Sequence, residues 1–205
     1  MGKNGLTAAL ANRIGTTESL DAAYDAMFGL AQGNETDKIV ELDLDSLCPH
    51  PKDPFKPYSD EKLEELAESI HDFGLIEPIV VRSVVRPDDD IADGVKYEIL
   101  SGKNRANAER LSGRKKIKSI IRDVDDDTAL LIITDANLKH RETLLPSEKG
   151  WAYRLQMEAI TKQGERRDLG ENSTSVQNEQ ELSRTVVAEN NNVKDSEIHR
   201  SASIL

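Results

Sequence analysis

The stretch that most constrains the fold is residues 97–113, YEILSGKNRANAERLSG. A short apolar run, YEIL, comes just before Gly102, and a second glycine, Gly113, closes the segment that follows. An apolar run of this length before a glycine is typical of a strand, and an Ala- and Glu-containing segment that stops at a glycine is typical of a helix. The sequence therefore predicts a strand joined directly to a helix, as in proteins of mixed α and β structure.

The segments around this unit are also predicted to be a mixture of strands and helices. Apolar and acidic residues alternate over residues 39–44, which predicts a strand, and four prolines make residues 48–59 an extended loop. Ser59 is expected to cap a helix that ends at Gly74 in a left-handed conformation. Further strands are predicted in LIEPIVVRSVV and KIKSIIRDV, and RPDDDIADG is expected to be the hairpin connection that leads into YEIL.

Helical spacing dominates the second half of the chain. It predicts a helix over residues 126–141 and another that starts at Pro146, whereas residues 161–182 are rich in Gln, Asn, Ser and Glu and indicate a polar linker. We therefore expect an α+β fold in five segments. These are a flexible N-terminal arm (1–37), an α/β domain (38–125), a helical extension (126–160), the polar linker (161–182) and a partial helix-turn-helix (183–205).

Charge is unevenly distributed along the 205 residues. The net charge is -11, which argues weakly against nucleic acid, yet residues 101–122 contain eight basic side chains and only one acidic one, Glu109. This segregation indicates a local partner that is an anion, and an ordinary solvated surface is the alternative. The basic residues are Lys103, Arg105, Arg110, Arg114, Lys115, Lys116, Lys118 and Arg122.

The junction between strand and helix is the candidate anion site. The first N–H groups of a helix are unpaired, and the helix dipole adds positive potential there. Gly102 lets an anion approach the backbone, Arg105 can make a forked contact to phosphate, and Lys103 adds a mobile charge. A capped surface turn would leave the same pattern, so both interpretations stay open on spacing alone.

Other chemistries find little support in the residue types. Cys48 is the only cysteine, so neither an internal disulfide nor a multi-cysteine metal site is possible. His50, His71, His140 and His199 lack the spacing of metal ligands. We see neither a charged-then-apolar leader nor a long apolar span, and therefore expect a cytoplasmic protein without a membrane partner.

Several segments, taken together and in order, resemble the ParB family of partition proteins. They are LDSLCPHPKDPFKPYSDEKLEELAESIHDFGLIEPIVV, then YEILSGKNRANAERLSGRKKIKSIIRDV, then ANLKHRETLLPSEKGWAY. The resemblance is to the ParB/sulfiredoxin-type N-terminal domain and covers roughly residues 39–160. Sulfiredoxin needs a cysteine in the turn where this chain has Lys103 and Asn104, so that reductase activity is set aside.

The resemblance implies a site for CTP with Mg²⁺. The loop that would face the base and ribose consists of Gly74, Leu75, Ile76 and Pro78. The motif that would meet the phosphates consists of Gly102, Lys103, Asn104 and Arg105. Asn137 and Arg141 would approach the triphosphate, with Asn137 also near the metal ion.

The chain departs from the family pattern at both phosphate motifs. Lys103 and Asn104 stand where the family has Glu and Arg, and Ala136 stands where it has the Glu that helps hydrolysis. Arg141 also lies one residue later, relative to Asn137, than in the family. We therefore expect nucleotide binding, with hydrolysis that is slow or undetectable, at most a weak CTPase.

The segment SRTVVAENNNVKDSEIHR has the spacing of a helix-turn-helix. Ala188 is the small residue of the first helix, Asn192 the left-handed turn residue, and Ile198 the aliphatic residue of the recognition helix. An ordinary amphipathic segment is the alternative. The candidate DNA contacts are Ser196, His199 and Arg200 in this unit, together with Arg114, Lys115 and Lys116 of the basic segment.

The helix-turn-helix looks unfinished, because the chain ends soon after the recognition helix begins. We expect a fragment of a longer protein or a shortened relative, with residues 183–205 mobile or ordered only by packing against another chain. The resemblance implies a DNA-segregation protein of a plasmid, chromosome or mobile element, associated with the nucleoid. CTP would gate its self-association into a dimer on DNA, and the N-terminal arm could contact a ParA-type ATPase.

Two alternatives remain from the sequence. The first is an enzyme of the same fold, a phosphotransferase or a nuclease-like protein, against which Ala136 counts. The second is a partner-binding module that has lost nucleotide function, which the replacements at Lys103 and Asn104 make credible.

Overall fold

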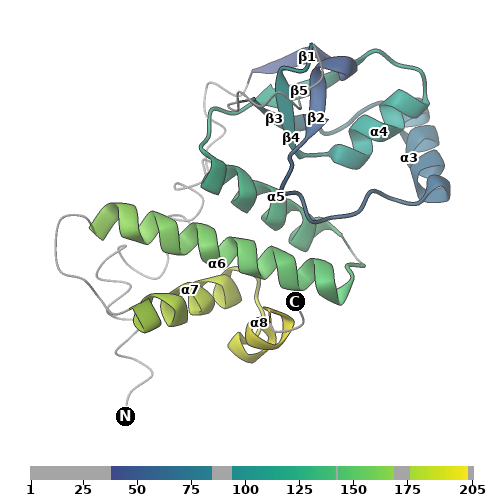
Figure 1. Cartoon of the computed structure of the whole chain (residues 1–205). Helices are drawn as coiled ribbons and strands as arrows, with labels where there is room; N and C mark the ends of the chain where they lie inside the picture. The colour runs from purple at the N-terminus through teal and green to yellow at the C-terminus, as the bar shows by residue number, and fades with distance from the viewer. Residues whose placement is uncertain (1–37, 85–93, 142, 169–175, 203–205) are drawn as a thin grey trace. The chain divides into compact units, whose positions relative to one another are not determined.

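The computed structural model describes residues 38–84, 94–141, 143–168 and 176–202. The predicted arm at 1–37 and most of the predicted hairpin connection lie outside these ranges. Within them the strands are interspersed with two helices and only helices follow the last strand (Figure 1), so the predicted α+β class is confirmed. The strands are β1 (Ile39–Asp43), β2 (Leu47–Pro49), β3 (Ile79–Ser83), β4 (Tyr97–Ser101) and β5 (Lys116–Ile121), with a 3-10 turn, η1 (Leu44–Ser46), between β1 and β2. The helices are α3 (Asp60–Phe73), α4 (Lys103–Leu111), α5 (Asp126–His140), α6 (Pro146–Asp168), α7 (Val176–Asn190) and α8 (Asp195–Ala202).

The strands form one mixed sheet in the order β1-β5-β3-β4-β2. β1 and β5 pair antiparallel, β5 and β3 parallel, β3 and β4 antiparallel, and β4 and β2 parallel. The short strand β2 includes Cys48 and Pro49, which we had assigned to an extended loop. A proline fits there because β2 is the edge of the sheet, where a missing N–H costs no internal hydrogen bond.

The two faces of the sheet are covered by different helices (Figure 1), because side chains alternate along each strand. On one face Ile79 and Val81 pack with Ala106 of α4. On the other face Leu100 packs with Ile133 of α5. The junction between β4 and α4 therefore lies between the helix that covers one face of the sheet, α4, and the helix that covers the other face, α5.

Helix α3 begins and ends near the predicted residues. Ser59 is its N-cap in extended conformation, and Gly74 follows its last residue. The backbone of Gly74 has φ 75° and ψ 170°, so it has positive φ but lies outside the left-handed helical region that we expected. Ala67 and Ile70 of α3 pack against Ala108 of α4, which joins the two helices as a pair.

The linker predicted at residues 161–182 is largely helical. α6 continues to Asp168 and α7 begins at Val176, so only the residues between them lie outside the described structure. Gln, Glu, Lys and Arg are good helix formers, and a scarcity of apolar residues therefore does not by itself predict a linker. None of the described helices is both long and apolar enough to span a bilayer.

The segment with helix-turn-helix spacing forms two helices joined by a turn. Asn192 adopts φ 51° in the turn between α7 and α8, and Val187, Ala188 and Ile198 are buried together with Tyr153 of α6. The unit is thus ordered on α6 of its own chain (Figure 1). That the unit is mobile in solution, or ordered only by packing against another chain, stays a prediction, and α6 supplies apolar contacts that the segment lacks in its own sequence.

A buried ionic cluster that the sequence did not reveal ties the sheet to α5. The guanidinium of Arg82 in β3 is 2% exposed and lies 3.0 Å from Oε2 of Glu98 in β4. It also donates a 2.5 Å hydrogen bond to Asp126 at the start of α5 and lies 3.3 Å from Nε2 of His50. The hydrogen bond from Arg82, more than any other contact, lowers the pKa of Asp126.

Candidate functional site

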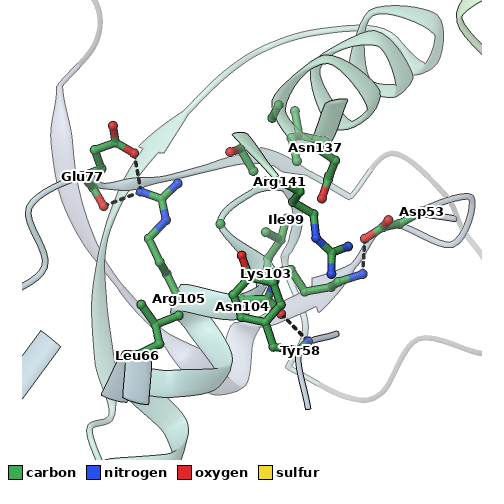
Figure 2. Close-up of a pocket in the computed structure, with 14 residues that line it drawn as sticks. Asp53, Tyr58, Leu66, Glu77, Ile99, Lys103, Asn104, Arg105, Asn137 and Arg141 are labelled. Carbon is green, nitrogen blue, oxygen red and sulfur yellow. Dashed lines mark hydrogen bonds and ion pairs between the residues drawn. The ribbon is translucent and has the colours of Figure 1, made fainter. Parts of the chain in front are cut away.

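A cavity of about 290 Å³ lies at the junction between β4 and α4 (Figure 2). Its lining comes from the proline-rich loop (residues 50–59), from α3 and the loop after it, from the β4–α4 junction, and from the C-terminal half of α5. The predicted residues that it brings together are Gly102, Lys103, Asn104, Arg105, Asn137 and Arg141. The lining residues that sequence reasoning missed include Asp53, Tyr58, Leu66 and Glu77.

Gly102 is required by the geometry of the junction. It is the N-cap of α4 and has φ 92° and ψ 24°, a left-handed conformation that glycine adopts without strain. A Cβ atom at this position would lie 2.6 Å from Cγ2 of Ile79 and 3.1 Å from Nε of Arg105. The glycine therefore lets the helix start close against β3, with its N-terminus facing the cavity.

Lys103 is bound by the proline-rich loop. Its ammonium group donates hydrogen bonds to Oδ2 of Asp53 and to the carbonyl oxygen of Phe55, and its side chain is 20% exposed. Asn104 acts on the same loop, because its Oδ1 accepts a 3.0 Å hydrogen bond from the N–H of Tyr58. Lys103 and Asn104, the two replaced residues of the phosphate motif, thus hold the proline-rich loop, which forms one wall of the cavity.

Arg105 is bound on the opposite side (Figure 2). Its Nη1 donates to the carbonyl oxygen of Glu77 at 2.7 Å, to Oε2 of Glu77 at 3.2 Å and to the carbonyl oxygen of Pro78 at 3.2 Å. Burial lowers the pKa of Arg105, and the nearby carboxylate of Glu77 opposes that shift. The guanidinium stays charged, but a ligand would have to share it with Glu77.

The loop after α3 lies differently from its predicted place. Gly74, Leu75, Ile76 and Pro78 are not among the residues that line the cavity, and Ile76 is 85% exposed. Leu75 packs against the core instead. Glu77 is the residue of this loop that lines the cavity. Nothing in the spacing of the sequence distinguishes Glu77 from its neighbours.

Arg141 differs from the other cations of the cavity. It is the C-cap of α5, and its guanidinium lies 5.1 Å from the centre of the Tyr58 ring. Its Nη1 is 4.0 Å from Oε1 of Glu148, which is an ion-pair distance but too long for a hydrogen bond. Among the described residues, its buried Nε and Nη1 have no hydrogen-bond partner.

Asn137 lies one turn before Arg141 and presents its amide to the same cavity (Figure 2). Its Nδ2 donates a 2.8 Å hydrogen bond to the carbonyl oxygen of Ile133. This contact orients the amide and makes Oδ1 the atom that can meet a ligand or a metal ion. No cluster of three or more His, Cys, Asp or Glu side chains suited to a metal ion is found in the described part of the chain.

The basic segment is largely engaged by the protein itself. Arg114 lies 3.0 Å from Glu109, and Arg110 donates to the carbonyl oxygens of Leu44 and Leu47. Across the β1–β5 pair, Lys116 stands opposite Asp43 and Lys118 opposite Glu41. The exposed face of β5 is therefore one of mixed charge. The other candidate DNA contacts, Ser196, His199 and Arg200, are exposed on α8.

Comparison with known proteins identifies the family of the chain. The sequence matches the ParB N-terminal domain over residues 30–138, more than half of the chain. It is 32% identical to a nucleoid occlusion protein of Oceanobacillus iheyensis, over 72% of this chain and 49% of that protein. It is also 32% identical to the chromosome-partitioning protein Spo0J of Thermus thermophilus, over 68% of this chain and 49% of that protein. The chain thus spans about half the length of these relatives.

A solved structure supports the fold. The C-terminally truncated chromosome-partitioning protein ParB of Caulobacter crescentus, complexed to the centromeric parS site, matches with a TM-score of 0.50 and 24% identity. The match covers 79% of this chain and 69% of that one. With the sequence match over residues 30–138, the strand–glycine–helix junction and the cavity beside it, the chain belongs to the ParB N-terminal domain family.

Proposed function

We propose that this chain is part of a ParB-like DNA-binding protein and that its cavity binds a nucleoside triphosphate of the CTP type. The observation that carries the proposal is the position of Arg141. Its guanidinium faces a cavity built by the motifs that resemble the family's nucleotide site, and its buried N–H groups lack a hydrogen-bond partner among the described residues. Burying a charged donor without a partner is costly, and phosphate oxygens would satisfy it.

The cavity also fits Mg²⁺ that arrives with the nucleotide. Mg²⁺ keeps several waters and is commonly held by substrate phosphates with few protein oxygens. Oδ1 of Asn137 would supply one such oxygen, which is supported by the hydrogen bond that Nδ2 of the same amide donates to Ile133. When bound, the metal ion would neutralise phosphate charge beside the carboxylates of Asp53 and Glu77, which also line the cavity.

Hydrolysis is expected to be slow in this site. Ala136 lines the cavity and cannot orient or activate water. The neighbouring Asp135 is buried and lies 3.1 Å from Lys139, so it is already committed within α5. Nucleotide would then act by occupying the site and favouring self-association of two copies. Its hydrolysis would be slow compared with this self-association.

DNA contact would come from α8 and from the basic segment. Ser196, His199 and Arg200 are exposed on α8, where a recognition helix would meet base edges. Arg114, Lys115 and Lys116 would contact phosphates only. A role in segregation on the nucleoid, with a dimer and a ParA-type ATPase as partners, belongs to the whole protein and is proposed on the family relationship.

One observation favours a second candidate, a partner-binding module without nucleotide function. Lys103 and Arg105 are both engaged by the protein's own carboxylates, at Asp53 and Glu77. A site that has lost its ligand could retain such contacts for stability alone.

Titration calorimetry with CTP, ATP, GTP and UTP, each with Mg²⁺, separates the two candidates. Preferential binding of CTP supports the nucleotide site, whereas no heat with any nucleotide supports the partner-binding module. Phosphate release measured in parallel tests hydrolysis. Brisk Mg²⁺-dependent release that survives Asp135→Ala would contradict the expected slow turnover.

A further inference from the structure

We propose that Tyr58 is a positioning residue that holds the guanidinium of Arg141 ready for a phosphate-type anion. The inference rests on the proposed nucleotide site, whose phosphate-binding part it assigns to Arg141 and Tyr58. The residues come from distant parts of the chain, the proline-rich loop and the end of α5, and meet at one side of the cavity (Figure 2).

The other cations of the cavity already have partners within the protein. Lys103 donates hydrogen bonds to Asp53 and Phe55, and Arg105 donates to Glu77 and Pro78. Each would have to give up or share an existing contact before binding an anion. Arg141 has no such contact at Nε or Nη1 within the described structure, so an anion that binds there breaks no existing hydrogen bond of these two atoms.

A carboxylate close to Arg141 leaves the donors of its guanidinium unused. Glu148 is the carboxylate that lies within ion-pair distance, and both of its oxygens already accept backbone hydrogen bonds. Oε1 accepts from the N–H of Lys56 at 2.9 Å and Oε2 from the N–H of Leu145 at 3.0 Å. Because the 4.0 Å separation from Arg141 is too long for a hydrogen bond, Glu148 offsets part of the charge and leaves the guanidinium donors unused.

An aromatic ring contacts the guanidinium of Arg141. The central carbon of the guanidinium lies over the ring of Tyr58, 5.1 Å from the ring centre, in a cation–π contact that uses the charge of the group and none of its N–H donors. The N–H donors point outward in the plane, where forked contacts to phosphate oxygens are made. The aromatic ring and an anion at the edge of the guanidinium are therefore compatible, and the ring restricts the rotation that would otherwise be lost on binding.

The loop that carries Tyr58 is itself held by two residues of α4. Oδ1 of Asn104 accepts the hydrogen bond of its backbone N–H at 3.0 Å, and Lys103 holds the same loop at Asp53 and Phe55. Lys103 and Asn104, the two residues that depart from the family's phosphate motif, thus hold the loop that carries the ring. Their effect on an anion would pass through Tyr58 to Arg141, without a direct contact to phosphate.

The test compares three variants of the full chain, with Mg²⁺ and either inorganic tripolyphosphate or CTP. Tyr58→Leu removes the ring and should weaken binding of both ligands about tenfold, the scale of a desolvated cation–π contact. Tyr58→Phe keeps the ring and should bind within about twofold of the wild type. Lys62→Ala is the matched control, because its amine also lies over this ring, at 6.0 Å, and should leave binding unchanged.

A spectroscopic measurement on the wild type keeps the inference testable if Tyr58→Leu does not fold. The Nε–H resonance of Arg141, assigned by its loss in Arg141→Lys, should move when tripolyphosphate is added. An Arg141 resonance that stays fixed while that of Arg105 moves would overturn the inference.

The outcomes separate this inference from the proposed function. If tripolyphosphate binds with the expected variant pattern and CTP binds no more tightly than tripolyphosphate, the role of Tyr58 is supported and the CTP site is contradicted. CTP binding that is equally tight in Tyr58→Leu overturns the role of Tyr58 and leaves the CTP site standing. Failure of the wild type to bind either ligand overturns both.

Discussion

The ammonium group of Lys103 donates hydrogen bonds to Oδ2 of Asp53 and to the carbonyl oxygen of Phe55. These contacts join the first residue of α4 to the proline-rich loop, two segments that are distant in sequence. The Asp53 side chain is only 8% exposed, so the pair lies largely out of water. A residue at a position that the family resemblance assigns to phosphate binding therefore has a structural partner of its own.

Replacing Lys103 should lower stability. Lys103→Met would leave the buried carboxylate of Asp53 without its cation, and we expect the free energy of unfolding to fall by about 1.5–3 kcal/mol, the scale of a hydrogen bond to a charged group. Urea denaturation measures the change. Lys115→Met, at an exposed site, is the control and should change stability by less than about 0.5 kcal/mol. Equal effects of both substitutions would show that the Lys103–Asp53 pair contributes nothing.

Gly102 and Gly113 form a matched pair for testing the junction. Both have positive φ, 92° and 73°, but a Cβ atom at Gly102 would collide with Ile79, whereas one at Gly113 would meet nothing within 4 Å. Gly113→Ala should cost about 1–2 kcal/mol from backbone strain alone. Gly102→Ala should cost about 1–3 kcal/mol more, because the core must shift as well. Thermal unfolding of the two variants gives the comparison, and equal losses would argue against close packing of α4 on β3.

Asp126 should make the fold sensitive to acid. The hydrogen bond from Arg82 lowers the pKa of Asp126 in the folded state, so its stabilising contribution is present above the unfolded pKa, about 4. This contribution is lost as the pH falls through the lowered folded pKa. The effect should be modest, because the Asp126 side chain is 62% exposed. Asp126→Asn should therefore flatten the stability profile below about pH 4. A profile as steep as that of the wild type would assign the acid sensitivity to other carboxylates.

Ile198 is expected to anchor the helix-turn-helix. Its side chain is fully buried in the cluster with Tyr153, Val187 and Ala188. Ile198→Ala should cost about 2–5 kcal/mol locally and speed hydrogen exchange in α7 and α8. Ser196→Ala, on the exposed side of α8, should leave exchange unchanged. Rapid exchange of α7 and α8 already in the wild type would favour the mobile unit expected from sequence alone.

Local patterns predicted the local structure well. The apolar run and glycine spacing around Gly102 indicated the β4–α4 junction, and the spacing of Ala188, Asn192 and Ile198 indicated the turn between α7 and α8. Each of these features depends on residues that are close in sequence. Backbone preference and helical periodicity decide them without knowledge of the rest of the chain.

Features that depend on tertiary contacts could not be predicted in the same way. Nothing in the proline-rich loop indicated that Asp53 would meet Lys103 or that Tyr58 would meet Arg141. The local excess of positive charge was real, but strand register places Lys118 opposite Glu41. Pairing partners across a sheet are set by topology, which a count of charges along the sequence does not contain.

The proposed binding of nucleotide phosphates by Arg141 in the cavity is tested most directly by calorimetric titration with Mg²⁺ and CTP. The comparison is between Arg141→Gln and Lys115→Gln, which change net charge equally, inside and outside the cavity. Arg141→Gln should weaken CTP binding by about 1.5–3 kcal/mol, roughly tenfold to more than a hundredfold, while Lys115→Gln binds like the wild type. Undiminished CTP binding by Arg141→Gln would contradict the claim.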